Sequence, residues 1–149
     1  MNKLTTVILL LFAAFSCGPK EHPVPFKQAQ NYYFRNDASA PEDAKITDQA
    51  TFESYFGMAA VMGRNGLPTS IDWNKEFVIA LVLPEATVET KIEPKSLTRE
   101  GDTLVLRYQI QTNPLPLSYT IRPFLLVIVD RQWVDYPVRL TQMKQFRVS

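Results

Sequence analysis

Cysteine and histidine are almost absent from this 149-residue chain, which contains one of each, Cys17 and His22. A single cysteine excludes a disulfide framework within the chain and any cysteine-rich zinc site. A single histidine excludes a multi-histidine metal site and makes a Ser-His-Asp triad depend on His22 alone. We therefore expect neither a metal ion nor a cofactor, and we predict no catalytic residue.

An excess of charge is also lacking, because 16 basic residues stand against 15 acidic ones and the formal net charge is +1. Proteins that bind nucleic acid usually carry a basic excess, so the charge balance argues against a nucleic-acid partner. Phosphate-binding glycine loops and the nucleophile-elbow motif are missing as well. The length suits one domain. These absences together favour a single domain that is not an enzyme.

Residues 1–16 have the pattern of an export signal. A short start with one positive charge, Lys3, precedes the mostly apolar stretch Leu4–Phe15. Twelve residues span about 18 Å as a helix, which is too short for a bilayer core of about 30 Å. This length is typical of the apolar region of a signal peptide.

The segment Ala14-Phe15-Ser16-Cys17-Gly18 follows directly and resembles the lipobox of bacterial lipoproteins. The resemblance implies a diacylglycerol thioether on Cys17, cleavage before Cys17 and acylation of the new amino group, for example with palmitate. Several acyl chains on one residue hold a protein firmly, whereas one chain binds only marginally. We expect an anchor in a bacterial membrane, the outer membrane in particular, with the domain in the periplasm or at the cell surface. The alternatives are an ordinary secretory signal and an apolar start without export.

The rest of the chain divides into a linker and a domain. Residues 17–30 contain Pro19, Pro23, Pro25 and several charges, a composition typical of an extended tether. Residues 31–149 are expected to form one globular domain. Within it, Asn31–Arg35 suits a first strand.

One helix is predicted over Ile46–Phe56. Phe52, Tyr55 and Phe56 fall on one helical face, and Thr47 or Asp48 can cap the helix start.

The remainder has the pattern of strands. Glu76–Leu83 and Tyr119–Val129 are nearly continuous apolar runs, which predict central strands buried on both faces. Residues 86–92 and 103–111 alternate and are expected to form an antiparallel hairpin through the turn Glu100-Gly101-Asp102, with an interruption after residue 112. In the second of these segments, Leu104, Leu106, Tyr108 and Ile110 face one way. Residues 133–140 alternate again. We predict an α+β fold with a mainly antiparallel sheet of five to six strands and one helix; a small β-sandwich is the alternative.

The segment Ile71-Asp72-Trp73-Asn74-Lys75, which leads into the first apolar run, resembles a motif of a known family. That family is the C-terminal domain of the lipoprotein subunit of bacterial surface protease complexes. The order of helix, strand, hairpin and a proline before an apolar strand is also similar, over residues 46–129. The resemblance implies an accessory role in protein binding, with an envelope protein such as a protease as the partner.

Two tryptophans are the candidate binding residues. Trp73 and Trp133 flank the apolar runs, and Trp133 falls on the polar face of its predicted strand, beside Arg131 and Asp135. An exposed tryptophan is a frequent anchor in protein interfaces. Trp73, Trp133, Arg131 and Asp135 therefore form the predicted contact set for a protein partner. A glycan or another small ligand stacked on either tryptophan is the alternative function, and simple packing under a loop is the third interpretation.

Overall fold

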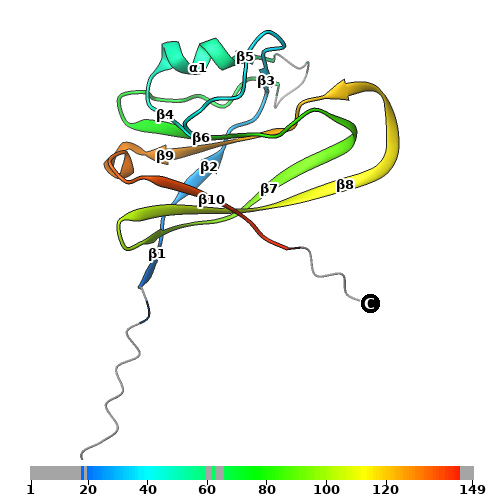
Figure 1. Cartoon of the computed structure of the whole chain (residues 1–149). Helices are drawn as coiled ribbons and strands as arrows, with labels where there is room; N and C mark the ends of the chain where they lie inside the picture. The colour runs from blue at the N-terminus through cyan, green and yellow to red at the C-terminus, as the bar shows by residue number, and fades with distance from the viewer. Residues whose placement is uncertain (1–17, 19, 60–61, 63–65, 145–149) are drawn as a thin grey trace, which may run out of the picture.

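The computed structural model describes residues 18, 20–59, 62 and 66–144, and these residues form three layers (Figure 1). Two four-stranded sheets lie face to face, and a helix with a two-stranded sheet covers the outer side of one of them. The predicted signal segment and Cys17 lie outside the described residues.

Each four-stranded sheet combines strands that are distant in the sequence. Sheet 1 has the order β1-β7-β8-β10, and sheet 2 has the order β2-β9-β6-β4. The strands of sheet 1 are β1 Glu21–Pro23, β7 Ala86–Glu100, β8 Thr103–Ile121 and β10 Val138–Gln142. The strands of sheet 2 are β2 Phe26–Gln28, β4 Lys45–Ile46, β6 Glu76–Val82 and β9 Phe124–Asp130.

The third layer, called the cap here, consists of α1 Gln49–Tyr55 and the paired strands β3 Tyr32–Phe34 and β5 Phe56–Met58. Asp48 caps the helix as predicted, because its side chain accepts a 2.8 Å hydrogen bond from the Thr51 amide. The helix is shorter than predicted. It ends at Tyr55, since Phe56–Met58 pair with β3 instead of continuing the helix.

The first apolar run forms the central strand β6, as predicted, but only the second part of the run Tyr119–Val129 forms the central strand β9. Tyr119–Ile121 belong to β8 in sheet 1, because the chain leaves that strand before Pro123. β6 and β9 pair antiparallel in the middle of sheet 2. Alternate side chains of β6 point to opposite faces, so Phe77 packs into the core between the sheets while Val78 packs under the cap. β9 does the same with Val127 and Ile128. Both faces of sheet 2 are therefore covered, which explains the lack of polar alternation in these runs.

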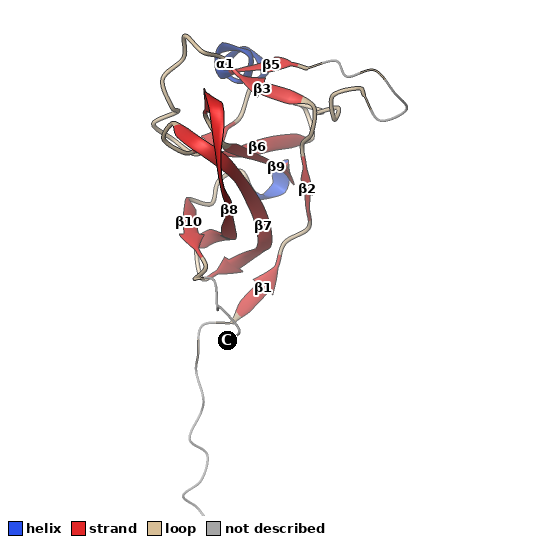
Figure 2. Cartoon of the chain, turned by 90° about the vertical axis from the view of Figure 1, so that its right-hand side faces the viewer, coloured by secondary structure: helices blue, strands red, loops and turns tan. Residues whose placement is uncertain are grey.

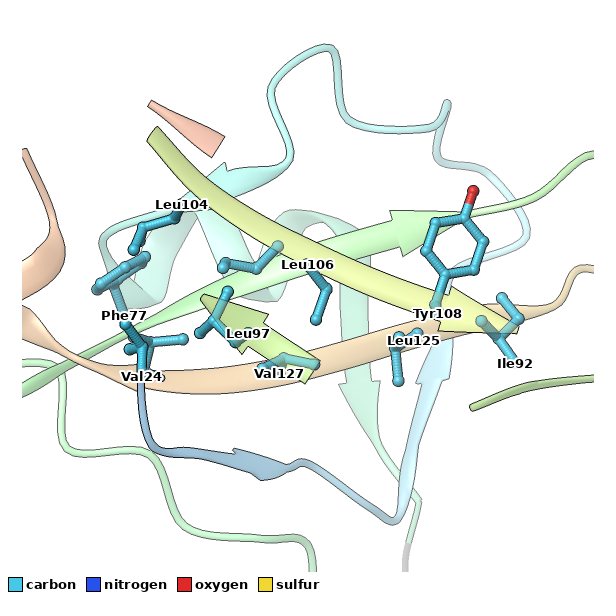
Figure 3. Packing of buried hydrophobic residues seen from close by; sticks show 11 residues of the cluster. Val24, Phe77, Ile92, Leu97, Leu104, Leu106, Tyr108, Leu125 and Val127 are labelled. Carbon is cyan, nitrogen blue, oxygen red and sulfur yellow. The ribbon is translucent and has the colours of Figure 1, made fainter. Parts of the chain in front are cut away.

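The main core lies between the two sheets (Figure 3). Sheet 1 contributes Leu97, Leu104 and Leu106 to it, and sheet 2 contributes Phe77 and Val127 from the opposite side. These side chains are at most 2% exposed. The predicted inward face of residues 103–111 is confirmed by this packing.

The expectation of a tether over residues 17–30 is corrected by strands β1 and β2. Glu21 pairs with Glu100 of β7, and Phe26 pairs with Val129 of β9. Between them, Val24 is 3% exposed in the main core. Proline lacks an amide donor but is tolerated in edge strands, and β1 and β2 are both edge strands. The proline content was therefore misleading from residue 21 onward.

Two further expectations about strands are wrong. β8 continues through Pro114 and Pro116, because irregular pairing with β7 between Val88 and Glu89 absorbs the extra residues. Residues 131–133 form the 3-10 helix η1, and β10 begins only at Val138. The Asp130 side chain accepts from the Gln132 amide, which turns the chain at the start of η1.

The fold class is confirmed at the coarse level, because the described part of the chain consists mostly of antiparallel strands with one α-helix. The described residues form ten strands in three sheets instead of five or six in one. The two four-stranded sheets pack face to face, as in the β-sandwich that was the alternative prediction, and the α-helix belongs to the cap. One pairing, β10 with β8, is parallel.

Candidate functional site

The cap contains a pocket with a volume of about 530 Å³. It opens between helix α1, the β3–β5 pair and the chain segment that precedes β6. The lining side chains are mostly apolar or aromatic. They include Tyr32, Arg35, Gln49, Phe52, Glu53, Phe56, Met58, Leu67, Pro68, Ile71 and Trp73.

Aromatic rings form the floor of the pocket. The Phe52 ring lies 5.2 Å from that of Tyr32, edge to face, and 5.3 Å from that of Trp73. It also stacks on Phe56 at 5.1 Å. Such contacts add about 0.5–1.5 kcal/mol per pair beyond the burial of area. The floor is therefore a rigid surface that presents aromatic edges and faces.

Hydrogen bonds connect the pocket segment that contains Leu67 and Thr69 to the chain around β3. The Tyr32 hydroxyl donates to the Thr69 carbonyl at 2.6 Å, and the Asn31 side-chain amide donates to the Leu67 carbonyl at 2.9 Å. The Gln30 amide donates to the Thr69 hydroxyl at 2.9 Å, and the Thr69 amide donates to the Gln30 carbonyl at 3.1 Å. Burial raises the pKa of Tyr32, so the hydroxyl stays a donor at neutral pH. The wall that carries Leu67 is thus tied to β3.

One wall of the pocket is polar. The Nε of Arg35 donates to the backbone carbonyl of Glu53 at 2.7 Å, which fixes the guanidinium against the helix. The Glu53 carboxylate accepts instead from Gln49, at 2.7 Å. The two Nη atoms of Arg35 have no hydrogen-bond partner among the described residues. The pocket therefore offers a positioned cation with donors to spare.

Exposed apolar side chains border the pocket. Met58 is 68% exposed and Leu67 is 82% exposed, and both line the opening. Tyr33, on the opposite face of β3 from Tyr32, is 47% exposed and lies over Gly57. A methyl group at Gly57 would come within 2.3 Å of the Tyr33 ring, so the glycine makes room for it. Clustered exposed apolar groups of this kind mark contact sites.

Of the predicted contact residues, Trp73 lines this pocket. The Arg131 side chain contacts the backbone of Trp73 and not its indole ring. Its Nη1 donates to the carbonyls of Thr47, Trp73 and Glu76, at 3.1, 2.8 and 3.3 Å. Arg131 therefore joins three backbone segments and has no side-chain contact with the pocket among the described residues. This favours a structural role for it.

Trp133 lies elsewhere. It closes η1, packs against the core between the sheets and contacts the Tyr136 ring at 5.6 Å. Its indole nitrogen is buried without a partner among the described residues. The prediction that it stands exposed on the polar face of a strand is wrong, because no strand forms there. Asp135 is exposed in the turn that follows, away from the pocket lining.

Sequence reasoning missed most of the pocket. The spacing of Phe52 and Phe56 indicated an apolar helix face, and both residues are indeed buried. Arg35 and Leu67 gave no signal, because a lone arginine after a strand and a leucine in a loop are common. The Gly66-Leu67-Pro68 segment indicated a loop, without a sign that it borders a cavity.

Comparisons with protein-family models, with curated proteins and with solved structures find no match to this chain. The resemblances to bacterial lipoproteins and to the protease-complex subunit therefore stay predictions. Among the described residues, no group of three His, Cys, Asp or Glu gathers to hold a metal ion. Within the same residues, no helix has the length and apolar character needed to span a bilayer.

Proposed function

We propose that this chain is a lipid-anchored lipoprotein of the bacterial envelope whose domain binds another protein in the cap pocket. The lipobox-like segment that ends in Cys17 supports the anchor. The observation that carries the binding role is the pocket of about 530 Å³, with its aromatic floor and its exposed apolar border. Interfaces concentrate their affinity in such pockets, which take a bulky side chain of the partner.

The chemistry of the pocket defines the partner segment. Phe52 and Trp73 suit a large apolar side chain. The free Nη donors of Arg35 suit a carboxylate beside it, because guanidinium and carboxylate form paired, charge-assisted hydrogen bonds. We expect the partner to insert an aromatic or aliphatic side chain that is followed by an acidic group.

The role is that of an accessory protein and not of an enzyme. The one histidine, His22, is exposed in β1 and does not line the pocket, so no nucleophile there has a histidine base. The resemblance around Trp73 makes an envelope protease, or an assembly that contains one, the first partner to examine.

Photo-crosslinking in the native envelope tests this proposal. A photoreactive residue in place of Leu67, on the pocket border, should form an adduct with a defined protein. The same residue in place of Lys91, which is exposed on β7 in sheet 1, should not. The adduct should then be reproduced with the purified partner.

Two matched variants sharpen the result. Met58 and Leu115 are both 68% exposed, but only Met58 lines the pocket. Met58→Glu should weaken binding of the purified partner by about tenfold or more, as expected for an interface anchor, whereas Leu115→Glu should leave it unchanged. Equal effects of the two variants would contradict pocket binding.

A glycan or small ligand is the second candidate function, because Trp73 lies in the pocket and can stack on a sugar ring. Under this alternative, Trp73→Ala removes retention on a glycan array and Trp133→Ala does not. Circular dichroism of both variants verifies folding. Retention that is unchanged in Trp73→Ala eliminates this alternative.

A further inference from the structure

The position of the first described strand, β1, limits how a lipid anchor can hold the domain; this step rests on the anchor proposed above. Glu21 is already part of β1, paired with Glu100 of β7. Four Cα–Cα steps separate Cys17 from Glu21, so their Cα atoms lie at most about 14 Å apart. The composition of residues 17–30 suggested a far longer spacer.

Glu21 is also held by a side-chain contact. Its carboxylate lies 3.7 Å from the Arg107 guanidinium, which in turn pairs with Glu100. Val24, three residues further on, is buried in the main core, and its amide donates to the Leu97 carbonyl at 2.9 Å. Val24 therefore fixes the chain in the core three residues after Glu21, and the pairing with β7 and the Arg107 contact hold the residues of β1 before it.

β1 and the pocket lie at opposite ends of the molecule. Figures 1 and 2 show β1 at the lower end and α1, β3 and β5 at the upper end, in views that differ by a quarter turn. Glu100, the partner of Glu21, directly precedes the Gly101-Asp102 turn, so this turn lies beside the start of β1. A domain of this size is about 35 Å across.

From these distances we infer that the anchored domain stands with the β1 end and the Gly101-Asp102 turn against the membrane surface, and that the cap pocket faces away from it. A connection of about 14 Å cannot let a domain of about 35 Å turn over to bring the pocket to the lipid. The pocket is therefore held toward soluble partners or toward domains that project from the same membrane. Lipid-embedded segments are excluded as its ligands.

Energy transfer from the protein to the membrane tests the orientation. Single cysteines are introduced in the full-length, lipidated protein at Asp102 in the turn or at Ala50 on α1, both exposed. The Cys17 sulfur is blocked by its thioether, so the new thiol alone takes a donor dye. The proteins are placed in phosphatidylethanolamine–phosphatidylglycerol vesicles with an acceptor on the headgroups. We expect the Asp102→Cys dye to lose most of its emission and the Ala50→Cys dye to keep most of it.

A longer tether is the matched control. A flexible Gly/Ser insert of about 20 residues after Lys20 spans about 25 Å on average. It should abolish most of the difference between the two dyes. Equal transfer from both positions in the protein without the insert would overturn the orientation while leaving the anchor intact. If the full-length protein fails to float with vesicles, as we expect of the Cys17→Ser variant, the anchor is overturned and this inference with it.

Discussion

Arg131 illustrates how a residue that resembles a binding group on the sequence can hold the fold together. Its guanidinium donates to three backbone carbonyls, and its own amide donates to the Lys75 carbonyl at 2.8 Å. The segment before α1, the Trp73 segment and the start of β6 thus meet at one side chain. All three bonds come from Nη1, at the end of a side chain that is longer than that of lysine and always charged, so a lysine would not reproduce them in full.

We predict that Arg131→Ala lowers the free energy of unfolding by about 2–3 kcal/mol, because charged hydrogen bonds to partly buried carbonyls are lost. Arg131→Lys should recover only part of it. Urea unfolding followed by circular dichroism measures both. Arg139→Ala is the control: Arg139 is 61% exposed and pairs only at the surface, so its loss should cost less than about 1 kcal/mol. If Arg131→Ala lowers the unfolding free energy by no more than Arg139→Ala does, the hydrogen bonds of Arg131 do not stabilise the fold.

Glu100 gives a pH dependence whose sign follows from its neighbours. The hydrogen bond from Arg107 lowers the pKa of Glu100 below its ordinary value of 4.5, against an opposing effect of burial. The folded state therefore binds the proton less readily than the unfolded state. The stabilisation is present at neutral pH and is lost as the pH falls below about 4.5 toward the folded pKa.

In Glu100→Gln this contribution is absent at every pH, so we expect its unfolding free energy to fall less steeply than that of the wild type below pH 4.5. Some decline should remain, because the pKa values of Asp48, Glu76 and Glu93 are also lowered. Urea titrations from pH 7 downward provide the comparison. Parallel curves would show that the Arg107 contact contributes nothing.

Among the elements, β1 and β2 carry the largest departure from expectation. The chain runs from Glu21 along the edge of sheet 1, crosses at Val24 to the edge of sheet 2 and then enters the cap at Tyr32. It joins all three layers. Pro23 and the charged residues Glu21 and Lys27 are exposed on these edge strands, so this segment has the composition of a linker although it forms strands.

Val24→Ala tests whether this segment belongs to the fold. Loss of two methyl groups at a buried site should lower the unfolding free energy by about 2 kcal/mol. Lys20→Ala, at an exposed position just before β1, should change it by less than about 0.5 kcal/mol. If both variants unfold at the same denaturant concentration, the segment is a tether after all.

The parts of the fold that were predictable are those with a strong local pattern. The apolar runs that became β6 and β9, the Asp48 cap and the Gly101 turn follow from side-chain chemistry within a few residues. The short edge strands β1 and β2 have no such local pattern, because they form by pairing with β7 and β9, which are distant in the sequence. The pocket was predictable only through Trp73, because a cavity arises where segments distant in sequence fail to fill space.

For the whole molecule, the anchor and the domain are expected to be separable. Cys17 precedes Glu21, the first residue of β1, by four positions in the sequence, so we expect Cys17→Ser to release the protein from membranes without changing its fold. Fractionation followed by circular dichroism of the soluble protein measures this, and capture of the partner at Leu67 should persist. An aggregated or unfolded Cys17→Ser protein would mean that the lipid is part of the folded state.

The pairing of β10 with β8 has a consequence for how the protein is made. β1, the first described strand, and β10, the last, form the two edges of sheet 1. Until residues 138–142 are available, β8 has an uncovered row of amides and carbonyls from Leu104 to Tyr108. A chain delivered from its N-terminus, by a ribosome or through an export channel, therefore cannot complete this sheet before its last strand emerges. Products cut short before Val138 should be the ones that aggregate.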